Sequence, residues 1–347
     1  MCLYPRLIKN KKYEPNKKNG GVAPEAKDPR CKMVPIGCGY CMECMKKRKN
    51  EWKVRLHEDI KRHKNGIFVT LTFSNKSWKE LKTDINKKSE VKGYALDNAI
   101  AKLATRRFLE RWRKKHKQSV RHWLVTELGH QGTERVHLHG IIFTDHKEDV
   151  KNIWNYGYVW DGSWKCDKKI NYVSEKTINY ITKYITKTDL QHKYYKPIIL
   201  CSPGIGKGYE QTFDAQQNKY KEGETKETYK NKNGHETALP IYYRNKIYNE
   251  EEREKLWIQK LDKEERWVGG IKVSTKENAD NYYKLLYWYR TKNKRLGFGA
   301  PDNWQARKYE HERRKLKHEE IFSPKRRQPT RNCGLPSAQG SLATTCR

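Results

Sequence analysis

The chain of 347 residues is long enough for a sizeable hydrophobic core, and it is strongly basic. Its 75 Lys and Arg residues exceed its 41 Asp and Glu residues by 34, and such an excess indicates a polyanionic partner, usually nucleic acid. No apolar run approaches the roughly 20 residues of a membrane helix, and the opening MCLYPRLIKNKKYEP lacks the apolar segment of a signal peptide. We therefore expect a protein of a reducing cytoplasm with no membrane partner. Nine cysteines, an odd number, also argue against a disulfide framework.

Composition divides the chain into four segments. We predict an irregular N-terminal arm over residues 1–50, a folded core over 51–190, an accessory region over 191–322 and a disordered tail over 323–347. The 22 Tyr and 11 Trp residues suit the stacking of single-stranded bases, because neighbouring Lys and Arg side chains would follow the phosphates. The same rings would equally serve as the core of a chain with few aliphatic residues.

A cysteine cluster lies near the end of the predicted arm. Cys38, Cys41 and Cys44 have the spacing C-x2-C-x2-C, which is compact enough for one metal ion. A structural Zn²⁺ normally takes four ligands, so Cys31 or His57 would have to complete the set. Because no second well-spaced cysteine pair follows, free thiols are the alternative interpretation.

The residues after this cluster predict a helix, a strand and a second helix. Trp52, Leu56 and Ile60 recur at every fourth position among charged neighbours, as in an amphipathic helix that ends at Gly66. The run IFVTLTF, residues 67–73, is β-branched and aromatic and predicts a buried strand. Asp97 would cap the next helix. The side chains of that helix expected to face the sheet are Ile100, Ala104, Phe108 and Trp112.

A β-hairpin is predicted next. The runs HWLVTEL, residues 122–128, and RVHLHGIIF, residues 135–143, are strand-like, and the turn-like GHQGTE joins them. The order strand, helix, hairpin, helix predicts an α+β fold in which helices cover one face of the sheet. Helix-like stretches at 249–261 and 277–292 predict a smaller, mainly helical C-terminal region.

The second hairpin strand carries two histidines on one face. Because strand side chains alternate, His137 and His139 lie opposite Val136, Leu138 and Ile142, so we expect the two imidazoles on the open face of the sheet. Imidazoles two residues apart on a strand are placed to bind one divalent cation. Half-exposed histidines without any ligand are the common alternative.

The hairpin would also bring a carboxylate to these histidines. Glu127 lies within the first strand and Glu134 in the turn, and we favour Glu127. Two histidines and one carboxylate form a three-ligand site with open positions, as a Lewis-acid catalyst requires.

Two overlapping Tyr-x-x-Lys motifs lie in NYVSEKTINYITKYITKTD, residues 171–189. Ser174 and Glu175 suit a helix start, and at 100° per residue one side of the helix would bury its isoleucines. The opposite side would present Tyr180, Lys183, Tyr184 and Lys187. A phenol with a pKa near 10 is a weak nucleophile at neutral pH, and adjacent lysines with a polarised target would overcome this weakness. A solvated polar face is the alternative.

The glycine-rich PGIGKGY, residues 203–209, is not a phosphate loop, because it lacks the spacing G-x-x-x-x-G-K-[ST]. No motif of an ATP-driven motor is evident in the sequence. Any unwinding of DNA would therefore require a separate helicase.

Three of these motifs, in this order, resemble a known family. FVTLTF at 68–73, HLHG at 137–140 and YITKYITK at 180–187 are similar to the three motifs of HUH endonucleases, which initiate rolling-circle replication. The doubled tyrosine resembles the replication initiators of microviruses (Microviridae). The segments at 38–52, 203–209 and 239–257 look closest to those of gokushoviruses, small single-stranded DNA phages. The resemblance covers about residues 31 to 300 and implies a central antiparallel sheet of the HUH type with flanking helices.

The resemblance implies an enzyme that nicks and joins phage DNA. Mg²⁺ or Mn²⁺ on the two histidines and a carboxylate would polarise the scissile phosphate at the viral origin. Tyr180 or Tyr184 would attack phosphorus, which leaves a 5′-phosphotyrosine and a 3′-hydroxyl that primes a polymerase. The other tyrosine would cut the regenerated origin, and the displaced circle would be rejoined. Lys183 and Lys187 would neutralise phosphate charge.

The implied partners are viral origin DNA, single-stranded at the nick, and a host helicase and DNA polymerase in the bacterial cytoplasm. Two other functions fit parts of the sequence. A plasmid replication initiator or conjugative relaxase would use the same chemistry, but the gokushovirus-like C-terminal segments disfavour it. The second is a non-catalytic basic protein that binds nucleic acid, holds zinc on its cysteines and has incidental histidines.

Overall fold

The computed structural model describes residues 1–321 except 88–89, 131–133, 163–171, 188–190, 193–194, 232, 277–278 and 302. The predicted disordered tail lies outside the described residues, as does the middle of the predicted hairpin turn. The chain forms two compact units: one joins Met1–Arg6 to Pro35–Trp304, and the other joins Leu7–Val34 to the residues from Gln305 onwards. The four predicted segment boundaries stay a prediction.

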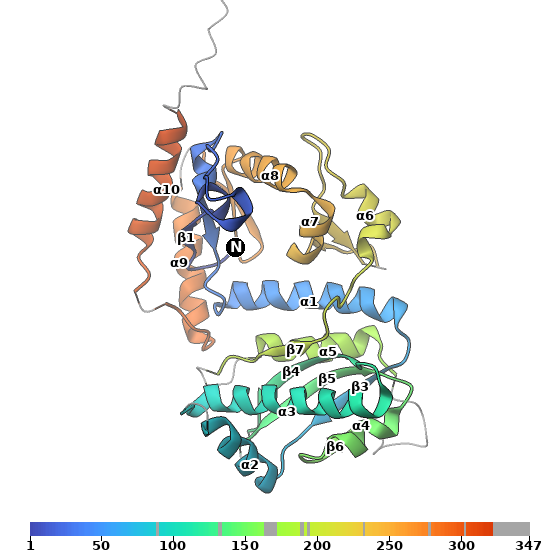
Figure 1. Ribbon diagram of the computed structural model, residues 1–347. Coiled ribbons are helices and arrows are strands. Elements are labelled where there is room, and N and C mark those ends of the chain that lie inside the picture. The colour runs from blue at the N-terminus through green and yellow to red at the C-terminus, as the bar shows by residue number, and fades with distance from the viewer. Residues whose placement is uncertain are drawn as a thin grey trace, which may run out of the picture. The chain divides into compact units, whose positions relative to one another are not determined.

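A five-stranded antiparallel sheet lies at the centre of the first unit, in the order β6-β3-β5-β4-β7 (Figure 1). Its strands are β3 (Gly66–Leu71), β4 (Arg121–Leu128), β5 (Val136–Phe143), β6 (Val159–Trp160) and β7 (Ile199–Cys201). The predicted strand at 67–73 and the predicted hairpin are therefore confirmed, and every paired neighbour in this sheet is antiparallel. The α+β class is confirmed as well.

One face of the sheet packs on α3 (Gly93–His116), with α2 (Asn75–Asn86) and α4 (Lys147–Ile153) beside it. The predicted apolar face of α3 is confirmed, since all four of its expected core residues are buried. The predicted cap at Asp97 is wrong, because the helix begins at Gly93 with Lys92 as its N-cap. Buried Leu96 explains the difference: it packs into the same core and draws one more turn into the helix.

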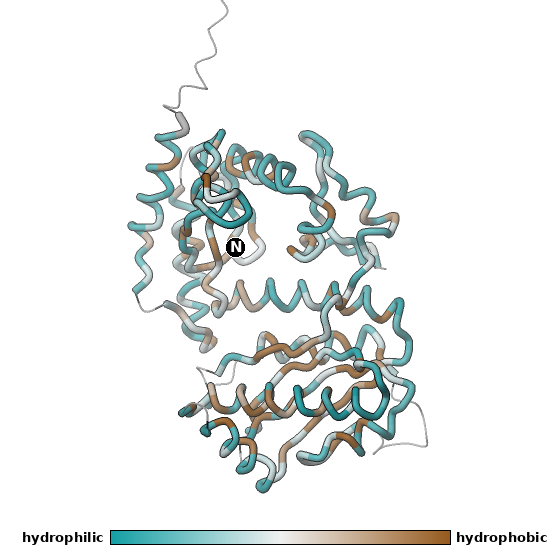
Figure 2. The backbone as a smooth tube through the Cα atoms, in the orientation of Figure 1, coloured by the Kyte–Doolittle hydropathy of each residue, from teal (hydrophilic) through white to brown (hydrophobic). Residues whose placement is uncertain are grey.

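The other face of the sheet is covered too, by α1 (Met42–Arg62) and α5 (Glu175–Thr186). The prediction of helices on one face is therefore wrong. Its physical reason is that β4 and β5 carry large apolar residues on this face as well. These residues are Trp123, Val125, Ile141 and Phe143. They form a second core with Leu56 of α1 and the isoleucines of α5, and Figure 2 shows hydrophobic residues along these strands.

Helix α1 is longer than its hydrophobic repeat suggests. It starts at Met42, ten residues before Trp52, so the cysteine cluster lies at its N-terminus. It ends at Arg62, before Gly66 opens β3, as the sequence predicts. Leu56 is fully buried, and Trp52 and Ile60 pack at the edge of the same core.

The rest of the first unit is mainly helical, as predicted, with small hairpins. Its elements are η4 (Tyr209–Gln211), α6 (Phe213–Gln217), β8 (Thr228–Lys230), β9 (Glu236–Ala238), α7 (Ile241–Ile247), α8 (Glu250–Asp262), β10 (Glu265–Val268), β11 (Ile271–Ser274) and α9 (Asp280–Arg295). The remaining elements of the chain are β1 (Arg6–Lys9), η1 (Lys11–Tyr13), η2 (Lys17–Asn19), η3 (Pro29–Lys32), β2 (Met33–Ile36) and α10 (Ala306–Ile321). Within the described part of the chain, no helix combines the length and the apolar character needed to cross a bilayer.

The glycine-rich segment Pro203–Tyr209 packs on α1. Gly206 has a φ of +74°, and a Cβ there would lie 2.7 Å from the carbonyl oxygen of Arg55, so the close approach requires glycine. The Gly206 amide donates a hydrogen bond to the buried carboxylate of Asp59 at 2.8 Å. This packing gives the segment a structural role and agrees with the prediction that it is not a phosphate loop.

Asp59 also accepts two hydrogen bonds from the guanidinium of Arg121 on β4. We predict that Asp59→Ala lowers the free energy of unfolding by about 3 kcal/mol, because it leaves Arg121 and the Gly206 amide without their acceptor. Denaturant unfolding measures the change. Asp84→Ala, which removes a surface ion pair with Arg107, is the control and should have little effect. Equal losses in the two variants would contradict the role of Asp59.

Candidate functional site

The predicted histidines and the favoured carboxylate lie together at one end of the β4–β5 hairpin. Glu127 of β4 is the cross-strand neighbour of His137 on β5, and His139 follows on the same face. This face is the one covered by α5, so the expectation of imidazoles on an open face is wrong. The apolar residues that continue the face, Ile141 and Phe143, attract the helix and thereby cover the histidines.

Both ring nitrogens of His139 have defined partners. Its Nε2 lies 2.8 Å from Oε2 of Glu127, and its Nδ1 lies 2.9 Å from the hydroxyl of Thr70, the residue paired with it on β3. A hydrogen bond at Nδ1 fixes the ring orientation and directs Nε2 toward the carboxylate. Sequence reasoning did not find Thr70. The signal available was alternation within FVTLTF, which places Thr70 and Phe68 on the histidine face.

Glu127 is held between two cationic or polar partners. Its second oxygen contacts the ammonium group of Lys187, at the C-terminal end of α5. Burial acts to raise the pKa of Glu127, but the hydrogen bonds from His139 and Lys187 outweigh it and lower the pKa below the usual glutamate value. The carboxylate is therefore ionised at neutral pH and is already placed to attract a cation.

The competing carboxylate, Glu134, lies elsewhere. It has a φ of +50° in the turn before β5, and its nearest ionic partner is His192, at 3.8 Å. The geometry thus favours Glu127 as the carboxylate that accompanies the histidine pair.

His137 completes this group at a greater distance. Its ring centroid is 6.4 Å from that of His139, with 26° between the planes. Burial lowers the pKa of His137, and the neighbouring His139 lowers it further, so His137 is a neutral imidazole at neutral pH. Among the described residues, the ligand atoms of the three side chains do not all lie within 4.8 Å of one another. The donor types suit a divalent cation, and closing the set would take movement of side chains.

Helix α5 carries the tyrosines and starts as predicted. The hydroxyl of Ser174 accepts a hydrogen bond from the Thr177 amide, and the two residues form a reciprocal capping box. The helix buries Ile178, Ile181 and Ile185. The predicted polar side is only partly exposed: Tyr180 is 44% exposed, whereas Tyr184, three residues after Ile181, turns toward the sheet and is 6% exposed.

The two tyrosines contact each other and the histidines. The ring of Tyr184 stacks on His139, with centroids 4.3 Å apart and 7° between the planes. Its hydroxyl donates a hydrogen bond to the hydroxyl of Tyr180 at 2.7 Å. Burial raises the pKa of Tyr184 well above the usual range, and the hydrogen bond to Tyr180 raises it further.

The exposed tyrosine has a different environment. The ring of Tyr180 packs edge-on against Phe68 of β3, and the ammonium group of Lys183 lies 3.9 Å from its centroid. The Tyr180 hydroxyl, in contrast to that of Tyr184, lies on a side chain that solvent reaches. The structure therefore brings the predicted Glu, His, Tyr and Lys residues into one site but gives the two phenols unequal access.

The predicted cysteine cluster forms a separate group. The sulfur atoms of Cys38, Cys41 and Cys44 gather with that of Cys2, and neither Cys31 nor His57 is part of this group. His57 lies thirteen residues beyond Cys44 on the same helix, about 20 Å away at 1.5 Å per residue.

Comparison with known proteins supports the region of the sheet and α5. Residues 66–189 match the profile of a family described as replication-associated protein ORF2. The match runs from the start of β3 to just beyond α5, and so it includes Glu127, both histidines and both tyrosines. It supports a relationship to the replication-associated proteins that initiate rolling-circle replication. No curated protein and no solved structure matches the chain.

Proposed function

We propose that this protein initiates rolling-circle replication of a small viral genome by nicking one strand of the double-stranded form at its origin and later rejoining the displaced circle. The observation that carries the proposal is the stacking of Tyr184 on His139, with Tyr180 hydrogen-bonded to Tyr184. Nucleophile and phosphate-activating groups are thus within one site. The match to replication-associated proteins over the same residues supports it.

The chemistry is a pair of transesterifications. A tyrosine hydroxyl attacks phosphorus, the bond from phosphorus to the 3′ oxygen breaks, and the phenolic proton leaves as the 3′ oxygen is protonated. The products are a 5′-phosphotyrosine and a 3′-hydroxyl that a host polymerase extends. In the second step, a 3′-hydroxyl attacks the phosphotyrosine, which releases the tyrosine and closes the circle. One phosphodiester is exchanged for another, so no nucleotide cofactor is consumed.

The donor set fits a divalent cation. His137, His139 and Glu127 would hold Mg²⁺ or Mn²⁺, which when bound would withdraw charge from the scissile phosphate. Lys187 now contacts Glu127, so this carboxylate already binds positive charge. Lys183 and Lys187 would neutralise phosphate charge in the transition state. Host helicase and polymerase would supply unwinding and synthesis within the bacterial cytoplasm.

The unequal environments of the tyrosines suggest an order of use. Tyr180 is exposed and accepts a hydrogen bond from Tyr184, and such a bond stabilises a phenolate at Tyr180. Tyr184 is buried against His139 with a raised pKa and must be uncovered before it reacts. Tyr180 therefore makes the first cut, and Tyr184 acts in the second.

This order predicts distinct phenotypes for single variants. Incubation with Mn²⁺ and supercoiled replicative-form DNA of the encoding genome should give nicked DNA joined to protein. Tyr180→Phe should lower that first covalent product at least about tenfold, whereas Tyr184→Phe should retain it and lose circle closure. The double variant should form none.

Tyr172→Phe, which alters an exposed tyrosine outside α5, is the matched control and should behave as wild type. A double variant that still forms the covalent product would refute the nucleophile assignment. Retention of the first cut in Tyr180→Phe and its loss in Tyr184→Phe would reverse the proposed order.

The carboxylate assignment has its own matched pair. Glu127→Gln removes the charge next to His139 and should reduce nicking by about 10–100-fold, while Glu134→Gln should leave it unchanged. His137→Ala and chelation of divalent metal should each reduce nicking as well. Loss of nicking in Glu134→Gln alone would assign the ligand to the turn, and nicking that survives both His137→Ala and chelation would exclude a metal on this site.

A further inference from the structure

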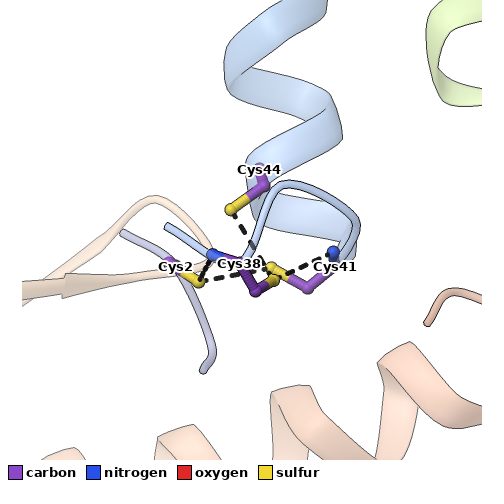
Figure 3. Close-up of side chains that lie close together, drawn as sticks. All are labelled: Cys2, Cys38, Cys41 and Cys44. Carbon is purple, nitrogen blue, oxygen red and sulfur yellow. Dashed lines mark hydrogen bonds between the residues drawn. The ribbon is translucent and has the colours of Figure 1, made fainter. Parts of the chain in front are cut away.

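Four cysteines from three parts of the sequence meet at the N-terminal end of α1. Cys2 comes from the start of the chain, Cys38 and Cys41 from the loop before the helix, and Cys44 from its first turn (Figure 3). All four sulfur atoms lie within 4.8 Å of one another, and none of the four residues forms a disulfide.

The sulfur separations fit a tetrahedral metal site. The Sγ atoms of Cys2 and Cys41 are 3.8 Å apart, and those of Cys38 and Cys44 are 3.9 Å apart. A tetrahedron with Zn–S bonds of about 2.3 Å has sulfur–sulfur edges of about 3.8 Å. A disulfide would need about 2.05 Å. The arrangement therefore has the dimensions of a tetrathiolate zinc site.

Backbone amides point at two of these sulfur atoms. The amides of Tyr4 and Cys38 donate to Sγ of Cys2 at 3.3 and 3.2 Å, and the amide of Cys41 donates to Sγ of Cys38 at 3.3 Å. Amide donors of this kind stabilise the thiolate form that a metal requires.

The loop is shaped around the sulfur atoms. A Cβ at Gly37 would lie 2.9 Å from Sγ of Cys44, and Gly39 has a φ of +87° that disfavours other residues. Cys41 occupies the N-cap of α1 without capping it, because its sulfur faces the cluster. The buried side chain of Asn293, from α9, accepts the hydrogen bond of the Met42 amide instead, at 2.8 Å.

We propose that Cys2, Cys38, Cys41 and Cys44 bind one structural Zn²⁺ that holds the first residues of the chain on α1 and α9. The surrounding contacts support this role. Leu3 is fully buried in a cluster with Tyr282 and Leu286 of α9, and its carbonyl oxygen accepts a hydrogen bond from Arg290 at 2.9 Å. The ion would thus fix the end of α1, the helix that packs on α5.

Tetrahedral sulfur ligation also suits iron, so the test must identify the metal. The full chain, with any affinity tag at the C-terminus, is purified without added metal, and its metal content is measured by elemental mass spectrometry. We expect one zinc per chain. Cys2→Ser should lower zinc affinity more than about tenfold, whereas Cys31→Ser and Cys201→Ser should keep the full content.

A second measurement covers a Cys2→Ser variant that does not fold. The zinc-free wild-type chain, kept reduced, is titrated with Co²⁺, and a tetrathiolate site should give intense visible absorption that Zn²⁺ then removes. His146→Ala serves as a further control, because His116, His146 and Asp149 form another compact group. Wild-type protein without zinc, with iron in its place, or with zinc lost equally in Cys31→Ser would overturn the proposal. The readout is metal content, so it does not depend on nicking.

Discussion

The site depends on one packing constraint, the burial of the second face of the central sheet under α5. His137 and His139 share that face of β5 with Ile141 and Phe143, because side chains alternate along a strand. The apolar pair must be removed from water, and the isoleucines of α5 do this. The same contact places Tyr184 on His139, so hydrophobic packing sets the distance between nucleophile and ligands.

Electrostatics then makes this packed arrangement reactive. A buried carboxylate costs free energy unless it is paired, and Glu127 is paired with His139 and Lys187. A DNA phosphate that enters the site would compete for the same lysine, and a divalent cation would compete for the carboxylate. Exchange of the Glu127–Lys187 contact for these ligands gives the site a way to couple DNA and metal binding. The large positive charge of the chain favours the approach of DNA.

Much of the core was predictable from local patterns. Alternation in RVHLHGIIF and the i, i+4 repeat that includes Phe108 and Trp112 each reflect short-range geometry, and the structure confirms both elements. The covering of both faces and the burial of Tyr184 were not predictable, because they depend on where α5 docks. Thr70 and Cys2 were missed for a related reason: each reaches its partner across a sequence separation of 69 or 39 residues, which spacing rules do not describe.

Mass spectrometry of the covalent protein–DNA product tests the central claim most directly. Wild-type protein is stopped during the first round of cleavage, the DNA is trimmed by nuclease, and the peptide that carries the remaining nucleotide is sequenced. The account predicts a phosphodiester on Tyr180 of α5, the exposed partner of the Tyr184–His139 stack. A nucleotide on a residue outside α5, or nicked DNA with no attached peptide, would contradict it.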